Sequence, residues 1–135
     1  MTTAHRANVK APARLRRPAV VYWAATLPIV AEALTGGAYD LLRLPPFFPL
    51  LAQLGYPAYL ATILGAAKIL AGLTLLLPRL PRLKEWAYAG VTINMLGAAS
   101  SWIAIGHGPS AYLPPLTFAA IALASWATRP PTRRL

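Results

Sequence analysis

The sequence predicts an all-α membrane protein, an antiparallel bundle of four transmembrane helices with both termini in the cytoplasm. The 135 residues are 57% hydrophobic and only 12% charged, which is too apolar for a soluble domain of this length. The apolar residues also gather into four stretches of about 20 residues, the length at which a helix crosses a ~30 Å hydrocarbon core. These stretches are residues 19–38, 57–77, 86–106 and 110–127.

The positive charge predicts the orientation of the bundle. If all four stretches cross, eleven of the thirteen Lys and Arg residues lie on one side, in segments 1–17, 78–85 and 129–135. The other two are Arg43, in the first loop of the opposite side, and Lys68, within the second stretch. An excess of Lys and Arg marks the cytoplasmic face. We therefore expect a membrane domain, 18–128, in the cytoplasmic membrane, between two basic cytoplasmic tails, 1–17 and 129–135.

The connections between the stretches support an up-and-down bundle, because the second and third are short. The first connection is longer and itself apolar. Pro45 and Pro46 can begin a short helix there and Gly55 can end one. We expect a short interfacial helix over 46–54, lying on the outer surface or re-entering the membrane.

Three polar side chains, Glu32, Lys68 and Asn94, interrupt the stretches. An ionised group at the bilayer centre costs about 2.5–3.5 kcal/mol on insertion scales, so such groups face the bundle interior and find one another. Lys68 and Asn94 are at similar depth, and the lysine stem can reach Glu32, which lies nearer the outside. Three interpretations stay open: an ion pair that fixes helix register, a pocket for a small polar or quinone-like head group, and a proton or ion path.

Small residues flank two of these polar groups at helical spacing. Gly65 and Gly72 share the face of Lys68, and Gly90 and Gly97 share the face of Asn94. Small residues let membrane helices approach closely. We expect the second and third membrane helices to pack on each other through these four glycines.

The composition excludes several classes of function. With no cysteine, the chain can carry no disulfide, iron–sulfur cluster or catalytic thiol. No catalytic residues and no metal site are expected, and His107, in the third connection, is expected to be solvated. Asp40 and Glu85 are expected to be solvated charges at helix ends. The basic residues flank apolar stretches, so they predict membrane topology rather than nucleic-acid binding.

Residues 55–101, together with the ending at 124–130, carry a family resemblance. The characteristic segments are GYP at 55–57, LGAAK at 64–68, RLKEWAYAG at 82–90 and ASW at 124–126, followed by Arg129 and Pro130. Together they resemble the DoxX-like family of small four-helix membrane proteins over residues 22–130. The family pattern often has an aspartate where this chain has Asn94, and the resemblance then implies that Glu32 replaces it as the partner of Lys68. It also often has a histidine at Trp102 and an acid at His107.

The resemblance implies a membrane subunit of a redox system, such as quinone-linked sulfur oxidation or a detoxifying oxidoreductase complex. We expect a non-catalytic accessory or anchor subunit in the lipid bilayer, with a quinone as candidate ligand and an oxidoreductase subunit or a second copy as candidate partner. One alternative is a small four-helix transporter of polar or cationic solutes that uses Glu32. The other is a structural scaffold without a ligand.

Overall fold

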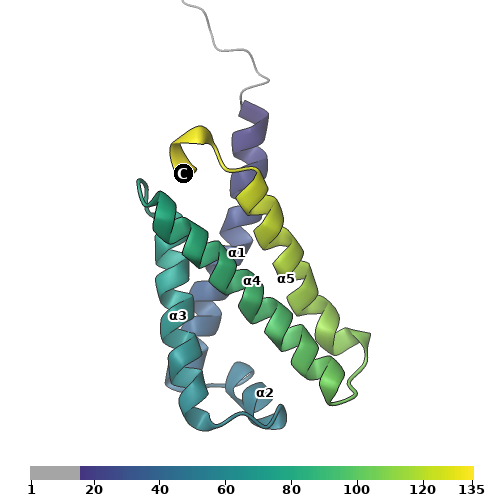
Figure 1. The fold of residues 1–135 in the computed structure, drawn as a ribbon. Coiled ribbons are helices and arrows are strands. Elements are labelled where there is room, and N and C mark those ends of the chain that lie inside the picture. Colours follow the sequence, from purple (N-terminus) through teal and green to yellow (C-terminus); the bar gives the residue numbers. More distant parts are fainter. Residues whose placement is uncertain (1–15) are drawn as a thin grey trace, which may run out of the picture.

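The computed structural model describes residues 16–135, and these are helical without a strand (Figure 1). The predicted N-terminal tail, 1–17, lies almost wholly outside them. The elements are α1 (Arg16–Leu42), α2 (Phe47–Gln53), α3 (Ala58–Leu76), α4 (Pro81–Ala104), α5 (Pro109–Ala127) and a 3-10 turn, η2 (Pro131–Arg133). The short helix expected over 46–54 is confirmed as α2.

Three of the described helices, α1, α3 and α5, are long and apolar enough to cross a membrane. Helix α4 is long enough at 24 residues but less apolar, because Asn94, Ser100 and Ser101 interrupt it and Lys84 and Glu85 lie in its first turns. It begins at Pro81, earlier than the apolar stretch at 86–106, because a proline is well tolerated at the first helical position. Helix α1 also extends beyond its predicted stretch, because it continues past residue 38 to Leu42.

The helices enclose a small core and leave an apolar exterior. Helix α1 packs chiefly against α3, and α4 packs chiefly against α5 (Figure 1). The contacts between α1 and α5 and between α3 and α4 are smaller. The core includes Ile29, Leu75 and Met95. Large side chains such as Leu70 and Ile93 are 65% and 69% exposed. A monomeric soluble protein rarely exposes so much apolar surface, so this exterior favours contact with lipid.

The glycines of α3 pack against α1 rather than α4, so the predicted contact between the two small-residue faces is wrong. A Cβ at Gly65 would lie 2.7 Å from the carbonyl oxygen of Gly37, and one at Gly72 would lie 2.9 Å from Leu34. Around Gly90 and Gly97 there is open space within 4 Å. Helical spacing correctly grouped these residues into faces, but it carried no information on which helix each face meets.

The C-terminal residues fold back onto the bundle and are not an isolated tail (Figure 1). The Arg133 guanidinium donates to the carbonyl oxygen of Leu75 at 3.1 Å and lies 4.8 Å from the ring centre of Trp23. Arg129 is 5% exposed. These contacts tie the end of the chain to α1 and α3.

Candidate functional site: a charged cavity between the helices

The central feature of the site is a lysine held between two carboxylates. The Nζ atom of Lys68 lies 3.1 Å from Oδ2 of Asp40 and 3.5 Å from Oε1 of Glu32. Lys68 comes from α3 and both acids from α1, where they lie eight residues apart. Gly36 lies between them and gives them room, since a Cβ there would be 2.8 Å from Glu32 Oε1 and 3.3 Å from Lys68 Nζ. The close packing of α1 on α3 therefore positions all three charges.

The structure brings Glu32 to Lys68 as the sequence predicts, but the expectation that Asp40 is solvated is wrong. The Asp40 side chain is 3% exposed, against 13% for Glu32 and 14% for Lys68. The reason is that α1 continues to Leu42, which keeps Asp40 on the helical face of Glu32 and Gly36. The spacing of these residues at i, i+4 and i+8 was a signal for this arrangement.

Asn94 lines the same cavity, at an intermediate exposure. Among the described residues no hydrogen bond joins its side chain to Glu32 or Lys68. The sequence predicts a polar centre of Glu32, Lys68 and Asn94. In the structure this centre is a Glu32–Lys68–Asp40 cluster, and Asn94 lines the same cavity from α4.

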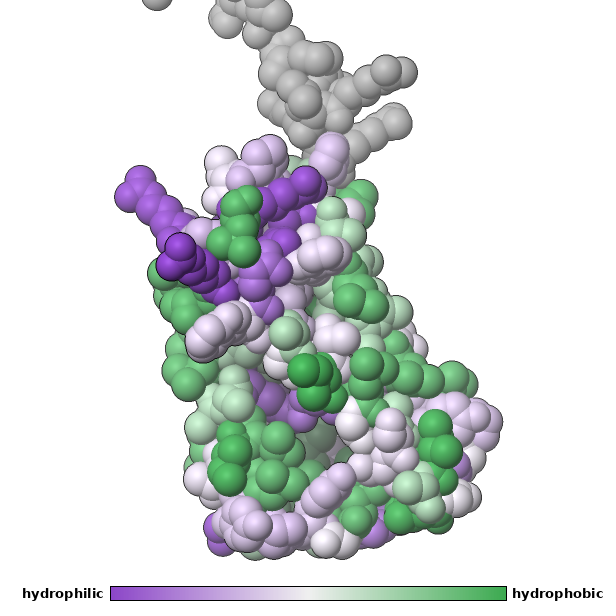
Figure 2. Space-filling view, in the orientation of Figure 1, coloured by the Kyte–Doolittle hydropathy of each residue, from purple (hydrophilic) through white to green (hydrophobic). Residues whose placement is uncertain are grey.

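These four polar residues line a cavity of about 1040 Å³ that is bounded by α1, α2, α3, α4 and α5. Much of the remaining lining is apolar, including Phe47, Leu51, Leu60, Leu64 and Phe118. Figure 2 shows a hollow in the lower half of the molecule, with hydrophilic residues at its upper edge and apolar residues around it. The cavity thus combines a charged wall with a hydrophobic body.

Polar contacts join α2 and the residues after it to α4 and the following loop at one end of this cavity. The Tyr56 hydroxyl lies 2.6 Å from Oγ of Ser101, and Nε2 of Gln53 lies 3.3 Å from Nε2 of His107. The ring of Trp102 meets the His107 ring edge-on at 4.9 Å. His107 is therefore in contact with both Gln53 and Trp102, and these partners were not apparent from the sequence.

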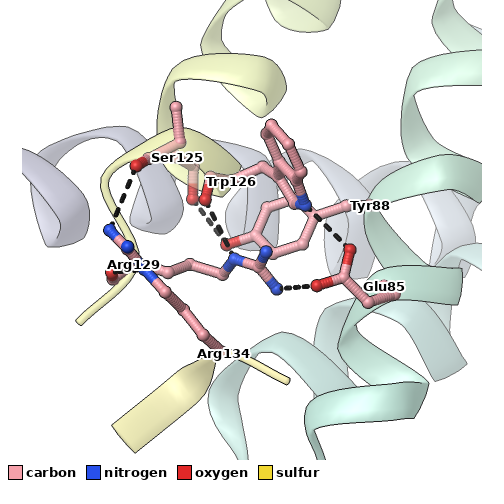
Figure 3. A network of polar contacts seen from close by, with 7 residues as sticks. Glu85, Tyr88, Ser125, Trp126, Arg129 and Arg134 are labelled. Atoms are coloured by element: carbon pink, nitrogen blue, oxygen red, sulfur yellow. Dashed lines mark hydrogen bonds and ion pairs between the residues drawn. The ribbon is translucent and has the colours of Figure 1, made fainter. Parts of the chain in front are cut away.

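A second polar network lies at the opposite end of the bundle (Figure 3). Glu85 accepts from the indole nitrogen of Trp126 at 2.8 Å and pairs with the Arg129 guanidinium at 2.5 Å. Burial raises the pKa of Glu85, but the bonds from Trp126 and Arg129 outweigh it and hold that pKa below its ordinary value. The expectation that Glu85 is merely solvated is wrong, because the C-terminal segment folds over it.

Hydroxyl groups of three helices meet next to this network. The Ser125 hydroxyl of α5 lies 2.6 Å from that of Thr26 in α1 and 2.7 Å from that of Tyr88 in α4. Buried hydroxyl groups that satisfy one another in this way help to select one register of the helices. The network accordingly has a structural explanation within the fold.

Lys84 of α4 is fully buried, and its side chain caps the C-terminal end of α3 at this side of the bundle. Its Nζ donates to the carbonyl oxygens of Thr74 and Leu77, which are among the carbonyls that a helix end leaves without partners. Burial, followed by the charges of Arg133 and Arg129, lowers the pKa of Lys84 to about 8. This lysine serves the fold and lies outside the cavity.

The charges of the cluster restrict what the cavity can bind. An ammonium group has three N–H donors, and on Lys68 the hydrogen bond to Glu32 and the ion pair with Asp40 take up at most two of them. One donor remains for a ligand. With both acids ionised the cluster has a net charge of −1, which disfavours an anionic head group. The remaining N–H donor of Lys68 can bind a neutral acceptor such as a carbonyl oxygen. The described residues contain no group of three or more His, Cys, Asp or Glu side chains that could hold a metal ion.

Apolar helices around a charged cavity define an integral membrane protein of the all-helical class. The model of the DoxX-like family matches residues 23–125. The chain belongs to this family, which confirms the resemblance seen in the sequence. No match was found among curated proteins or among solved structures.

Proposed function

We propose that the protein is an accessory or anchor subunit of a quinone-linked redox complex in the cell membrane and binds a quinone head group in its cavity. The observation that carries the proposal is the partly buried Lys68, held by two carboxylates at the wall of a largely apolar cavity. A cavity of about 1040 Å³ is at the upper end of the usual size for small-molecule sites, about 300–1,000 Å³.

In this proposal each part of the site has a role. The free N–H of Lys68 donates to a quinone carbonyl oxygen, while Glu32 and Asp40 fix the position of the ammonium group. The apolar lining contacts the ring. The accessory role rests on the family resemblance and on the lack of cysteine, which excludes an iron–sulfur cluster carried by this chain. Electrons for a bound quinone then come from a partner subunit.

The proposed topology has α1, α3, α4 and α5 crossing the membrane in alternating directions, with both termini in the cytoplasm. The charge bias supports it, because Arg79, Arg82 and the C-terminal arginines then share one side. Since the chain has no cysteine, single cysteines placed at Thr132 and Ser110 provide a direct test. A membrane-impermeant maleimide applied to intact cells should label the Ser110→Cys variant and spare the Thr132→Cys variant. Labelling of the Thr132→Cys variant alone would show that the protein has the opposite orientation.

Binding is tested with the purified protein and a benzoquinone that has a methyl group in place of a tail. Quenching of tryptophan fluorescence reports binding, since Trp102 lines the cavity. Lys68→Met should weaken binding about tenfold or more, because a hydrogen bond from a charged donor is lost. Arg82→Met, at an exposed cation of α4, is the matched control and should bind as the wild type does.

A second variant keeps this test independent of the stability of the charged cluster. Gly97 lines the cavity and has open space around its Cβ position, so Gly97→Leu should fold and fill the site. It should abolish binding. Wild-type protein that does not bind the quinone, or a Gly97→Leu variant that binds it normally, would refute the quinone site.

The accessory role is tested by purification from native membranes in mild detergent, with mass spectrometry and an absorption spectrum. A stoichiometric oxidoreductase or a cofactor-bearing partner is the expected result. A colourless protein that elutes alone or as a self-oligomer would contradict this role.

One observation favours the transporter as a second candidate. The cluster has two carboxylates for one lysine, and the Phe47 ring lies 5.7 Å from Lys68 Nζ, an environment that suits an organic cation. Uptake of an organic cation that is lost in Glu32→Gln would favour transport. The two single-cysteine variants add a second criterion, because mixed orientation is typical of small four-helix transporters.

A further inference from the structure

A second, smaller cavity opens between α3 and α4. It has a volume of about 500 Å³ and is lined by exposed apolar residues, of which Leu70, Trp86 and Ile93 are 65%, 77% and 69% exposed. Gly90 lies on its wall, and a Cβ there would meet no atom within 4 Å. The small residue on α4 therefore leaves a groove on the apolar exterior instead of a helix contact.

This groove and the central cavity share part of their lining, which makes them adjacent. The shared residues are Glu32, Leu64, Lys68, Asn94 and Met95. A molecule in the groove and one in the central cavity would therefore both reach Lys68. The charged cluster lies where an apolar exterior groove adjoins a partly polar interior.

We propose that the groove between α3 and α4 is a lateral portal that holds the hydrocarbon tail of the ligand while its head group occupies the central cavity. The inference rests on the proposed quinone site and adds the class of ligand: a membrane-soluble quinone with a long apolar tail, entering from the lipid. The net negative cluster disfavours a phospholipid, whose phosphate would face Glu32 and Asp40. A neutral head group with an apolar tail matches both parts of the lining.

The two glycines of α4 separate the tail site from the head site. Gly90 lies in the groove and Gly97 in the central cavity, and both have open space around the Cβ position. Because a Cβ fits at both positions, we expect Gly90→Leu to fill the groove and Gly97→Leu to fill the cavity while the fold is kept. Leu96→Phe enlarges an exposed α4 side chain that lines neither space and is the matched control.

The experiment compares a methyl-substituted with a decyl-substituted benzoquinone in detergent, by quenching of tryptophan fluorescence. Wild-type protein should bind the decyl form about tenfold or more tightly than the methyl form, because the tail buries apolar surface. Gly90→Leu should lose this advantage while binding the methyl form as the wild type does. Gly97→Leu should bind neither form.

Three results would overturn the portal. The first is a Gly90→Leu variant that binds the decyl form as tightly as the wild type does. The second is a wild type that binds the two forms equally tightly. The third is a Leu96→Phe variant that loses as much affinity for the decyl form as Gly90→Leu does. In each case binding of the methyl form by the wild type would leave the proposed head site intact. Failure of the wild type to bind either quinone would instead refute the proposed function, and with it the portal.

Discussion

Replacing Lys68 by methionine should destabilise the protein strongly, because it leaves Glu32 and Asp40 facing each other without a cation. The two contacts of the ammonium group measure 3.1 and 3.5 Å. At an effective dielectric constant of about 20, each corresponds to a gross attraction of about 5 kcal/mol. Desolvation offsets much of this attraction, and removal of one partner from a buried pair typically costs about 3–5 kcal/mol.

The structure favours the lower end of that range for Lys68→Met. The side chains of Lys68 and Glu32 keep 14% and 13% of their exposure and line an open cavity, so water partly screens them. We expect a loss of about 3 kcal/mol, which corresponds to a fall in melting temperature of about 10 °C for a chain of this size. Thermal unfolding in detergent, followed by circular dichroism, measures this change.

The neutralised acids provide the internal control for this prediction. Adding Asp40→Asn to Lys68→Met should restore more stability than adding Glu32→Gln, because Asp40 is more deeply buried and lies closer to the lysine. The triple variant should recover most of the loss. Arg82→Met removes an exposed cation and should melt as the wild type does. A Lys68→Met protein that melts at the temperature of Arg82→Met, or no recovery in the triple variant, would refute the reasoning.

Three further predictions concern packing and the opposite end of the bundle. Gly65→Ala should lower the free energy of unfolding by about 1–3 kcal/mol, because its Cβ would overlap the backbone of α1. Gly90→Ala should instead raise the free energy of unfolding by about 0.5–1 kcal/mol. If thermal unfolding shows that both variants change stability in the same direction, the assigned faces are contradicted. Lys84→Met should cost about 1–3 kcal/mol, since two carbonyl groups at the end of α3 lose their donor, and the same melting experiment would show it. The folded-state pKa of Glu85 is below its ordinary value of 4.5, so the stability that its ionised form contributes should be fully present at pH 7 and be lost as the pH falls below 4.5 through the folded-state pKa. The difference in melting temperature between wild type and Glu85→Gln should therefore shrink over that range. A constant difference would rule out the ion pair with Arg129 as its source.

The sequence by itself determined the class, the family and the first half of the charged cluster. Apolar stretches long enough to span a bilayer require helices, because unpaired backbone groups are too costly in lipid. Two opposite charges, Glu32 and Lys68, within such stretches require a shared interior. The prolines and the glycine of the first connection were likewise enough to predict α2, because they limit local backbone geometry.

The tertiary structure decided which faces meet and which charges are buried. Asp40 became part of the cluster because α1 runs on to Leu42, and Glu85 gained its ion pair because the chain after α5 folds back over it. Gly65 contacts α1 while Gly90 opens a groove. Helical periodicity places residues on a face, but the neighbour of that face depends on contacts between segments far apart in the chain, and no local pattern contains them.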